Sequence, residues 1–300
     1  MGALGDVVQA MGAAAAIRSF HAGAQITVLT THPYADLLRQ APYFDDVWVD
    51  ERPGWSDPAG VLRLARRLRG GHFDRVYDLS TRQRSALYFW LMRRPGLEWS
   101  GIVRGASHRQ PDTPERRRMH TLDREADQLR WAGIPGPVPP PDLSWAASDI
   151  GRFALPPDYV LLMPGGAPHR PEKRWPLANF IGLARRVSAA GPTPVVVGGP
   201  GERDLGAAIV AAIPQARDLT SQTELGDIVA LGRRARRAIG NDTGPMHLAV
   251  VGGAPATVLY SAASDPALTA PHGRDVVILR RDDLADLPVD EVVATLGLPS

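Results

Sequence analysis

The 300-residue sequence contains no cysteine and only one lysine, Lys173, among its 34 basic residues. The lack of cysteine excludes disulfide bonds, thiolate nucleophiles and cysteine-ligated metal centres. Aromatic residues are also scarce, and no basic motif interleaved with them suggests nucleic-acid binding. The N-terminus lacks the basic segment of a secretory signal and reaches Asp6 almost at once. These absences predict a cytoplasmic protein with no nucleic-acid partner.

Arginine supplies nearly all of the positive charge, although the formal net charge is only +2. Three segments are rich in arginine: residues 63–69, 116–118 and 233–237. Such clusters usually belong to solvated helix faces, but they also suit an anionic acceptor or membrane surface. Peripheral contact with an anionic membrane surface is therefore a further expectation.

One segment, residues 243–264, carries no charged side chain and is long enough to imitate a membrane span. The turn residues at 252–255 interrupt it, and residues 256–260 have the character of a strand. We expect a buried helix, turn and strand here.

Helices and strands alternate along the first half of the chain. Apolar periodicity predicts helices at 6–20, 34–40, 58–68, 84–92 and 122–132, and strands at 25–30, 46–49 and 75–79. Polar residues 103–119 are predicted to form a loop. This alternation is typical of an α/β fold with a doubly wound parallel sheet.

The second half repeats this alternation after a proline-rich segment, residues 133–141, which is predicted to be a stiff linker. The domain boundary is expected within residues 133–155, giving domains 1–140 and 141–300. The predicted strands are 159–163, 194–197, 217–219, 256–260 and 276–279, and the predicted helices are 176–190, 203–213, 224–234 and 289–296. Two such domains are expected to enclose a ligand-binding cleft.

The first predicted helix begins without a strand before it. Gly2 and Gly5 form a turn of the kind that follows a parallel strand, yet no strand precedes them in this sequence. In a doubly wound sheet the first strand is central. We therefore expect the N-terminal sheet to contain a gap or an improvised pairing, as a truncated or misassigned start would produce. The loss is destabilising, because each buried Val- or Leu-sized side chain contributes roughly 1.5 to 3 kcal/mol.

Residues 237–249 combine an apolar strand end, a turn containing Asp242 and Thr243, and a following helix with Pro245 in its first turn. Free N–H groups at a helix N-terminus carry about half a positive charge and suit a phosphate or diphosphate. The pattern predicts a nucleotide-diphosphate cradle. A capped helix without a ligand remains the alternative.

Lys173 and Asp6 are the two candidate catalytic side chains beside such a cradle. A glycine-containing loop at residues 165–168 leads to Lys173, whose ammonium could neutralise a leaving diphosphate. Alternatively, Lys173 lies on the surface with Trp175 packed as a lid. Asp6 is either a helix cap or an ionised carboxylate that serves as a general base. Residues 198–202 lack the third glycine of a dinucleotide fingerprint, which argues against a nicotinamide site.

Five motifs together resemble the signature series of glycosyltransferase family 9, the bacterial lipopolysaccharide heptosyltransferases. They match in order and spacing over essentially the whole chain: GALGDVV at 2–8, EKRWP at 172–176, VGGPGE at 197–202, LTSQTEL at 219–225 and IGNDTGPMHL at 239–248. The sequence departs from the family at residues 260–266, where many members carry Phe-Gly-Pro-Thr-Asp-Pro. Donor or acceptor preference is expected to differ accordingly.

The resemblance implies a GT-B fold of two Rossmann-like domains, with neither a catalytic metal nor a cofactor. The absence of an Asp-x-Asp pair agrees with this implication. By the family's pattern Asp6 is the general base and Lys173 contacts the donor phosphate. The implied donor-binding residues are Gly166, Asp242, Thr243, Gly244, Pro245, Met246 and His247.

The implied reaction is inverting transfer of heptose from ADP-heptose to an anionic lipid-A core acceptor. Acceptor contacts are expected from four arginines of the N-terminal domain: Arg82, Arg84, Arg104 and Arg109. Two other possibilities remain at this stage: a GT-B transferase that uses another nucleotide sugar, such as a UDP-sugar, or an inactive relative that only binds a nucleotide.

Overall fold

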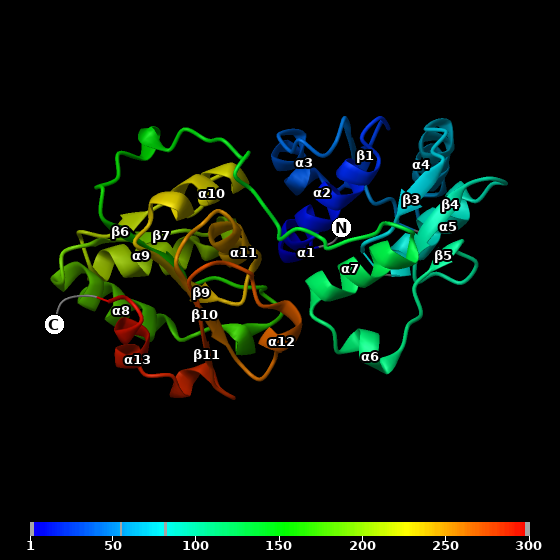
Figure 1. The fold of residues 1–300 in the computed structure, drawn as a ribbon. Coiled ribbons are helices and arrows are strands. Elements are labelled where there is room, and N and C mark those ends of the chain that lie inside the picture. The colour runs from blue at the N-terminus through cyan, green and yellow to red at the C-terminus, as the bar shows by residue number, and fades with distance from the viewer. Residues whose placement is uncertain (1–2, 55, 81–82, 298–300) are drawn as a thin grey trace. The chain divides into compact units, whose positions relative to one another are not determined.

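The computed structural model describes residues 3–54, 56–80 and 83–297, and the chain divides into two compact units, Met1–Pro141 and Asp142–Ser300. Each unit has an α/β architecture in which the strands pair in parallel, as predicted (Figure 1). Within the described ranges, no helix is long and apolar enough to cross a membrane.

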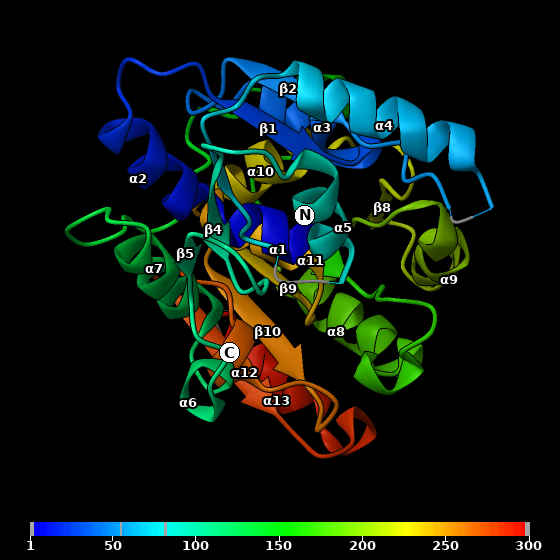
Figure 2. The same cartoon turned by 90° about the vertical axis from the view of Figure 1, so that its right-hand side faces the viewer.

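The first unit contains two small parallel sheets. One pairs β1 (Thr27–Thr30) with β2 (Asp46–Val49), and the other has the order β3 (Arg75–Tyr77), β4 (Glu98–Gly101), β5 (His108–Arg109). In Figure 2 the first pair lies along the upper edge, beside α3 and α4, while β4 and β5 lie below it. The helices of this unit are α1 (Leu4–Gln9), α2 (Met11–Phe20), α3 (His32–Arg39), α4 (Pro58–Gly70), α5 (Gln83–Met92), α6 (Pro114–Arg117) and α7 (Thr121–Trp131).

The second unit contains one six-stranded parallel sheet of order β11-β10-β9-β6-β7-β8. Its strands are β6 (Tyr159–Met163), β7 (Thr193–Val196), β8 (Arg217–Asp218), β9 (Arg237–Asn241), β10 (Ala256–Tyr260) and β11 (Val276–Arg280). Its α-helices are α8 (Leu177–Ala189), α9 (Arg203–Ala212), α10 (Leu225–Arg234), α11 (Gly244–Val251), α12 (Pro266–Thr269) and α13 (Val289–Ala294). Short 3₁₀ turns occur at Gly151–Phe153, Pro171–Lys173, Pro200–Glu202 and Leu284–Asp286.

The core of the second unit lies on both faces of this sheet. Side chains of α8, α9 and α13 pack with Val160 and Leu162 on one face, while α10 and α11 cover the other (Figure 1). All five residues of β6 are buried. Because β6 is buried on both faces, it is an apolar run and shows no polar alternation. Each such side chain contributes roughly 1.5 to 3 kcal/mol.

Two local predictions for the first unit need correction. The helix predicted at 6–20 consists of α1 and α2, which meet at Ala10. The predicted loop at 103–119 contains the short strand β5 and the helix α6, which Thr113 caps by accepting from the Arg116 N–H. The proline segment packs against α2, where a side chain at Gly12 would lie 2.2 Å from the Pro139 carbonyl oxygen.

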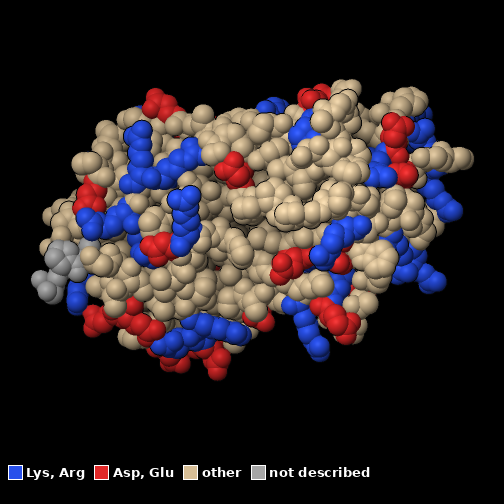
Figure 3. Space-filling view, viewed as in Figure 1, with Lys and Arg blue, Asp and Glu red and all other residues tan. Residues whose placement is uncertain are grey.

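The arginine clusters are only partly the solvated faces that the sequence suggests. Exposed arginines occur along α4, and basic side chains gather along the outer edge of the first unit in Figure 3. Arg116 and Arg237, in contrast, are buried. Arg116 donates to Gln110 over 2.6 Å, and Arg237 donates to Asp275 over 2.6 Å. These two guanidinium groups therefore form hydrogen bonds within their own units and are not solvated.

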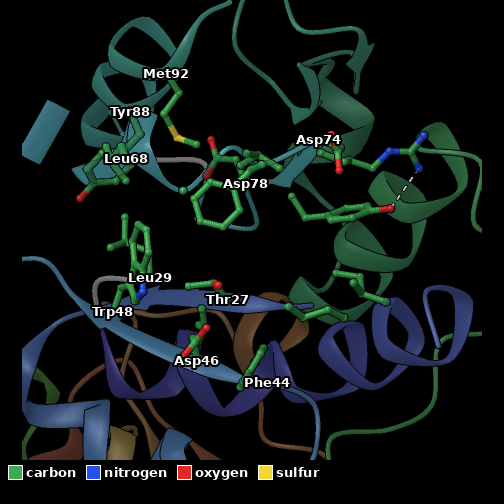
Figure 4. Close-up of a pocket in the computed structure, with 18 of the residues that line it drawn as sticks. Thr27, Leu29, Phe44, Asp46, Trp48, Leu68, Asp74, Asp78, Tyr88 and Met92 are labelled. Atoms are coloured by element: carbon green, nitrogen blue, oxygen red, sulfur yellow. Dashed lines mark hydrogen bonds between the residues drawn. The ribbon is translucent and has the colours of Figure 1, made fainter. Parts of the chain in front are cut away.

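The gap predicted in the N-terminal sheet is present. Among the described residues no strand lies between β1 and β3, and the two sheets are separate. A cavity of about 610 Å³ occupies this place, lined by both strands and by α2 (Figure 4). The lining of this cavity includes Thr27 and Leu29 from β1 and Tyr77 from β3. Gly2, which belongs to the turn invoked for this prediction, lies outside the described residues.

Candidate functional site

The strand order of the second unit determines where a ligand can approach it. The first strand, β6, is central, and the chain continues to β7 on one side and to β9 on the other. In sheets of this order, ligands bind beyond the carboxyl ends of the strands at the point where the order reverses. That point lies between β6 and β9, so the segments that follow Met163 and Asn241 form the candidate site.

Asn241, the last residue of β9, holds these segments together. Its side-chain amide donates to the carbonyl oxygens of Pro164 (2.9 Å) and Gly165 (3.0 Å), and its amide oxygen accepts from the Trp175 N–H (2.9 Å). The side chain is fully buried, and all three partners are backbone groups. The loop between β6 and α8 is thereby fixed at both ends.

Lys173 lies within that loop and pairs with the residue after Asn241. Its Nζ lies 2.7 Å from Oδ2 of Asp242, and the two side chains are 16% and 9% exposed. Burial raises the pKa of Tyr260, and the nearby Asp242 carboxylate adds to this effect. The ammonium group is thus held beside the start of α11, where the sequence predicted it.

The N-terminus of α11 forms the rest of the predicted cradle. Thr243 is the N-cap and makes no side-chain cap hydrogen bond, and Pro245 lies in the first turn. Helix geometry leaves the N–H groups of Gly244 and Met246 without an intrahelical acceptor. Gly240 permits the close packing behind them, because a side chain there would lie 2.9 Å from the Met246 sulfur and 2.7 Å from Met163. His247 is buried in the next position of the helix.

Gly166 completes this group of residues. A side chain at Gly166 would come within 3.7 Å of the Thr243 methyl group and 3.4 Å of Arg174. Arg174 donates to the Gly166 carbonyl oxygen, while Arg170 donates to the Ala263 carbonyl oxygen over 2.6 Å. The second bond connects the lysine loop to residues 260–266, where the sequence departs from the family's pattern. The structure therefore brings Gly166, Lys173, Asp242 and the α11 N-terminus together.

Trp175 is not a surface lid over Lys173. It is 2% exposed, packs edge-to-face against Phe180 and donates its indole N–H to the Leu287 carbonyl oxygen over 3.0 Å. The tryptophan anchors the end of the lysine loop in the core.

Asp6 lies in the first turn of α1, and the N-cap of that helix is Ala3. Asp6 is therefore not the N-cap residue; it is the third residue of the helix, where a carboxylate lies near the free N–H groups of the first turn. Glu125 of α7 interacts electrostatically with Asp6, and no motif of the sequence predicts this pairing. Burial raises the pKa of Glu125 to about 8, and the negative charge of Asp6 adds to this effect.

The four predicted acceptor arginines have different surroundings. Arg84 donates to both carboxylate oxygens of buried Asp50, at 3.1 and 3.3 Å. Arg104 and Arg109 are exposed, and Arg109 donates to the Ile102 carbonyl oxygen over 3.2 Å. Arg82 lies outside the described residues. Across the part of the chain that the structure describes, no group of three or more acidic or histidine residues could hold a metal ion.

Comparisons with known proteins show the family of this chain. The sequence profile of glycosyltransferase family 9 (heptosyltransferase) matches residues 61–291. The chain belongs to glycosyltransferase family 9. A lipopolysaccharide core heptosyltransferase of Haemophilus influenzae is 24% identical over 293 residues, which cover 91% of this chain and 80% of that protein.

Two solved structures show the same fold. ADP-heptose lipopolysaccharide heptosyltransferase II of Escherichia coli matches with a TM-score of 0.79 and 22% identity, covering 99% of this chain and 96% of that one. A family 9 glycosyltransferase of Veillonella parvula matches with a TM-score of 0.84 and 21% identity, covering 97% and 93%. The chain is thus a glycosyltransferase with the GT-B fold of two Rossmann-like domains.

Two polar residues of this family 9 chain were not predicted from the sequence. Asn241 was visible only as a polar residue at the end of an apolar strand, and its three partners lie at least 66 residues away. Glu125 belongs to a helix rich in charged residues, so the pattern of polar and apolar residues does not indicate that its side chain is buried.

Proposed function

We propose that this family 9 enzyme transfers a heptose residue from ADP-heptose to a hydroxyl group of the lipopolysaccharide inner core. The observation that carries the proposal is the Lys173 ammonium, held by Asp242 at the N-terminus of α11. The names of the related enzymes supply the identity of the sugar and of the acceptor.

In this proposal residues 141–300 bind the donor. The diphosphate lies against the N–H groups of Gly244 and Met246, where the helix dipole favours negative charge. Lys173 contacts the phosphate directly. Asp242 accepts from sugar hydroxyls, because its carboxylate would repel the phosphates. Gly166, Thr243, Pro245 and His247 complete the donor pocket.

The transfer proceeds with inversion at the anomeric carbon. Asp6 removes the proton of the acceptor hydroxyl, whose oxygen forms a bond to the anomeric carbon from the face opposite ADP. The bond between that carbon and the diphosphate oxygen breaks, and ADP leaves with the bonding electrons. Lys173 and the α11 dipole stabilise the charge that develops on the diphosphate. Neither a metal nor a cofactor takes part.

Residues 1–140 supply the acceptor contacts. Arg104 and Arg109 are exposed and suit the phosphates and carboxylates of an anionic lipid-A core. The Arg84 guanidinium already binds Asp50, so an acceptor would share it with that carboxylate. Arg82 belongs to the same proposal.

The chain is proposed to work in the cytoplasm, against the inner face of the inner membrane. Leu62 of α4 and Trp90 of α5 are 50% and 56% exposed. Exposed Arg63 follows Leu62 directly and exposed Arg66 lies about one helical turn after it, while the Arg93 guanidinium lies 5.3 Å from the Trp90 ring. Arg69 of α4 donates to the Leu91 carbonyl oxygen over 2.7 Å, which fixes the two helices side by side. Apolar and cationic side chains in this combination favour an anionic lipid surface.

A transfer assay with defined donors tests the function. Incubation with ADP-heptose and a heptose-free lipid-A core acceptor should yield a product heavier by one heptose, with its anomeric configuration inverted. In thermal-shift measurements, ADP should stabilise the protein more than UDP, GDP or TDP. Turnover of UDP-sugars alone would identify a different transferase, and binding of ADP without any turnover would identify an inactive relative.

A further inference from the structure

Tyr260, the last residue of β10, carries a buried hydroxyl group that has no hydrogen-bond partner. Its side chain is fully buried, and no group in the described part of the chain forms a hydrogen bond with its oxygen. A buried hydroxyl without a partner costs free energy, and such groups are rare in native proteins. This hydroxyl is therefore expected to find its partner in another state of the molecule.

The sheet places Tyr260 beside Asp242. In the pairing of β9 with β10, Leu259 lies opposite Asn241, and the Asp242 N–H donates to the Leu259 carbonyl oxygen over 3.1 Å. Tyr260 and Asp242 follow these two residues, and side chains at the same level of neighbouring parallel strands point to the same face. The Tyr260 carbonyl oxygen accepts from the Arg281 N–H over 3.0 Å, so β11 fixes the tyrosine from its other side.

Two polar groups lie near the phenol oxygen. One is the Asp242 carboxylate, whose negative charge adds to the effect of burial in raising the pKa of Tyr260. The other is the Thr269 hydroxyl group, which donates to the Asp265 carbonyl oxygen over 3.2 Å. A charged carboxylate is a stronger acceptor than a neutral hydroxyl oxygen. Asp242 is therefore the better partner for Tyr260.

In the ligand-free structure, Lys173 is the partner of Asp242. The two side chains are only 16% and 9% exposed, so solvent can replace the lysine only in part. Loss of one partner from a buried ion pair is strongly unfavourable for the group that remains. A second donor on the same face of the sheet would offset part of this cost.

We propose that Tyr260 is a positioning residue of the donor site, whose hydroxyl donates to Asp242 when Lys173 turns from this carboxylate to the diphosphate. The inference rests on the proposed function and adds the group that replaces the lysine. The exchange matters most in the complex with ADP. Sugar hydroxyls that donate to Asp242 leave with the transferred heptose, while ADP still holds Lys173. Tyr260 then supplies a donor to the carboxylate, so the exchange strengthens the binding of ADP.

Tyr260→Phe removes the hydroxyl and keeps the ring. We expect it to weaken ADP binding about tenfold in calorimetric titration, since a hydrogen bond to a charged acceptor is lost in the complex. The Tm of the ligand-free protein should stay the same or rise, because the hydroxyl has no partner there.

Tyr159→Phe is the matched control. Tyr159 is also buried in this sheet, but its hydroxyl donates to the Leu231 carbonyl oxygen over 2.8 Å. This variant should lower Tm and change ADP affinity less than about twofold. An equal loss of ADP affinity in both variants would overturn the inference, because any missing buried hydroxyl would then have the same effect.

The Lys173→Ala background separates an exchange of partners from a fixed contact. Without the ammonium group, Tyr260 can donate to Asp242 both with and without ADP. Adding Tyr260→Phe to Lys173→Ala should therefore change ADP affinity less than about twofold. A tenfold loss in both backgrounds would show that the hydroxyl only shapes the pocket, and this would overturn the inference.

The measured quantity is nucleotide binding and not transfer. If the affinities follow the expected pattern but no heptose is transferred, the exchange is supported and the proposed function fails. If heptose is transferred while Tyr260→Phe binds ADP as tightly as the wild type, the exchange is overturned and the proposed function stands.

Discussion

The Lys173 ammonium lies 2.7 Å from the Asp242 carboxylate, at the point where the second sheet reverses its strand order. The chain's single lysine is therefore positioned by an ion pair that is mostly withdrawn from solvent. A compact ammonium in this position can turn from the carboxylate to a phosphate oxygen without leaving the site.

Replacement of Lys173 tests its role toward the leaving group. We expect Lys173→Ala to lower kcat about 100-fold or more, because charge on the diphosphate develops most strongly in the transition state. Steady-state kinetics and calorimetric titration with ADP would separate turnover from binding. Arg186→Ala is the matched control, since Arg186 forms an exposed ion pair with Asp290 on the other side of α8 from the core. Equal effects of the two substitutions would contradict the assignment.

Asp6→Asn tests the proposed general base. The amide keeps the shape of the side chain but cannot take a proton, so kcat should fall about 100-fold or more. Binding of ADP should change less than about twofold. Asp36→Asn, at an 85% exposed position of α3, is the control. Near-normal turnover in Asp6→Asn would exclude this carboxylate as the base.

The raised pKa of Glu125 predicts that the stability of the protein depends on pH. Its pKa is raised from 4.5 to about 8 in the folded state, so between these values the unfolded chain binds fewer protons than the folded one. Stability should therefore fall as pH rises through this window. Glu125→Gln removes the ionisation, and we expect it to have a higher Tm than the wild type at pH 8.5 but a similar Tm at pH 5.

The control for this experiment is Glu51→Gln, at an exposed position of the same unit. Thermal unfolding of the three proteins at both pH values provides the measurement. A Tm difference between Glu125→Gln and wild type that does not change with pH would show that ionisation of Glu125 is not its source.

Asn241→Ala tests the interior link between the two loops. It leaves the Trp175 N–H and two carbonyl oxygens without their partner, at a cost of about 2 to 4 kcal/mol. We expect a fall in Tm of about 5 °C or more, measured by calorimetry. The control is Asn179→Ala, the other asparagine of the chain, which lies partly exposed on α8. A loss no larger than that of the control would mean that the three hydrogen bonds contribute little.

Trp90→Ala tests the proposed membrane contact. Co-sedimentation with vesicles that contain an anionic lipid should fall about threefold or more, because a large interfacial aromatic side chain is lost. Trp131→Ala, at a 51% exposed tryptophan of α7, should leave binding unchanged. Vesicles of zwitterionic lipid should bind neither protein strongly. Equal losses for both variants would indicate nonspecific adsorption.

The helices and strands that could be predicted from the sequence are those whose local residue pattern is sufficient to determine the structure. Strands 159–163 and 256–260 were placed residue for residue, because each is an uninterrupted apolar run bounded by turn residues. The gap between β1 and β3 was also predictable, since the centre of a doubly wound sheet is the place of its first strand. The polar segment 103–119 was missed in part, because β5 forms through pairing with β4 and not through local preference.

The site was predictable to a similar degree. Lys173, Asp242 and the α11 N-terminus come together because they follow neighbouring parallel strands, whose carboxyl ends meet at one edge. Pairings between distant residues were not predictable. Arg84 binds Asp50, which lies 34 positions earlier in the sequence. Neither residue belongs to a motif from which the pairing could be predicted. Trp175 was open to two interpretations because its environment depends on Leu287, 112 residues further along the chain.

Asn241 has one more consequence. The side chain of Asn241 binds the loop that carries Lys173 to the end of β9, and β9 leads directly to the N-terminus of α11. The Lys173 amine and the peptide dipoles of α11 are therefore held in place by the same strand. The entropy of ordering that loop is lost when the polypeptide folds and not when a donor arrives. Nucleotide affinity in this enzyme should accordingly reflect contact energy, with little penalty for freezing the receptor.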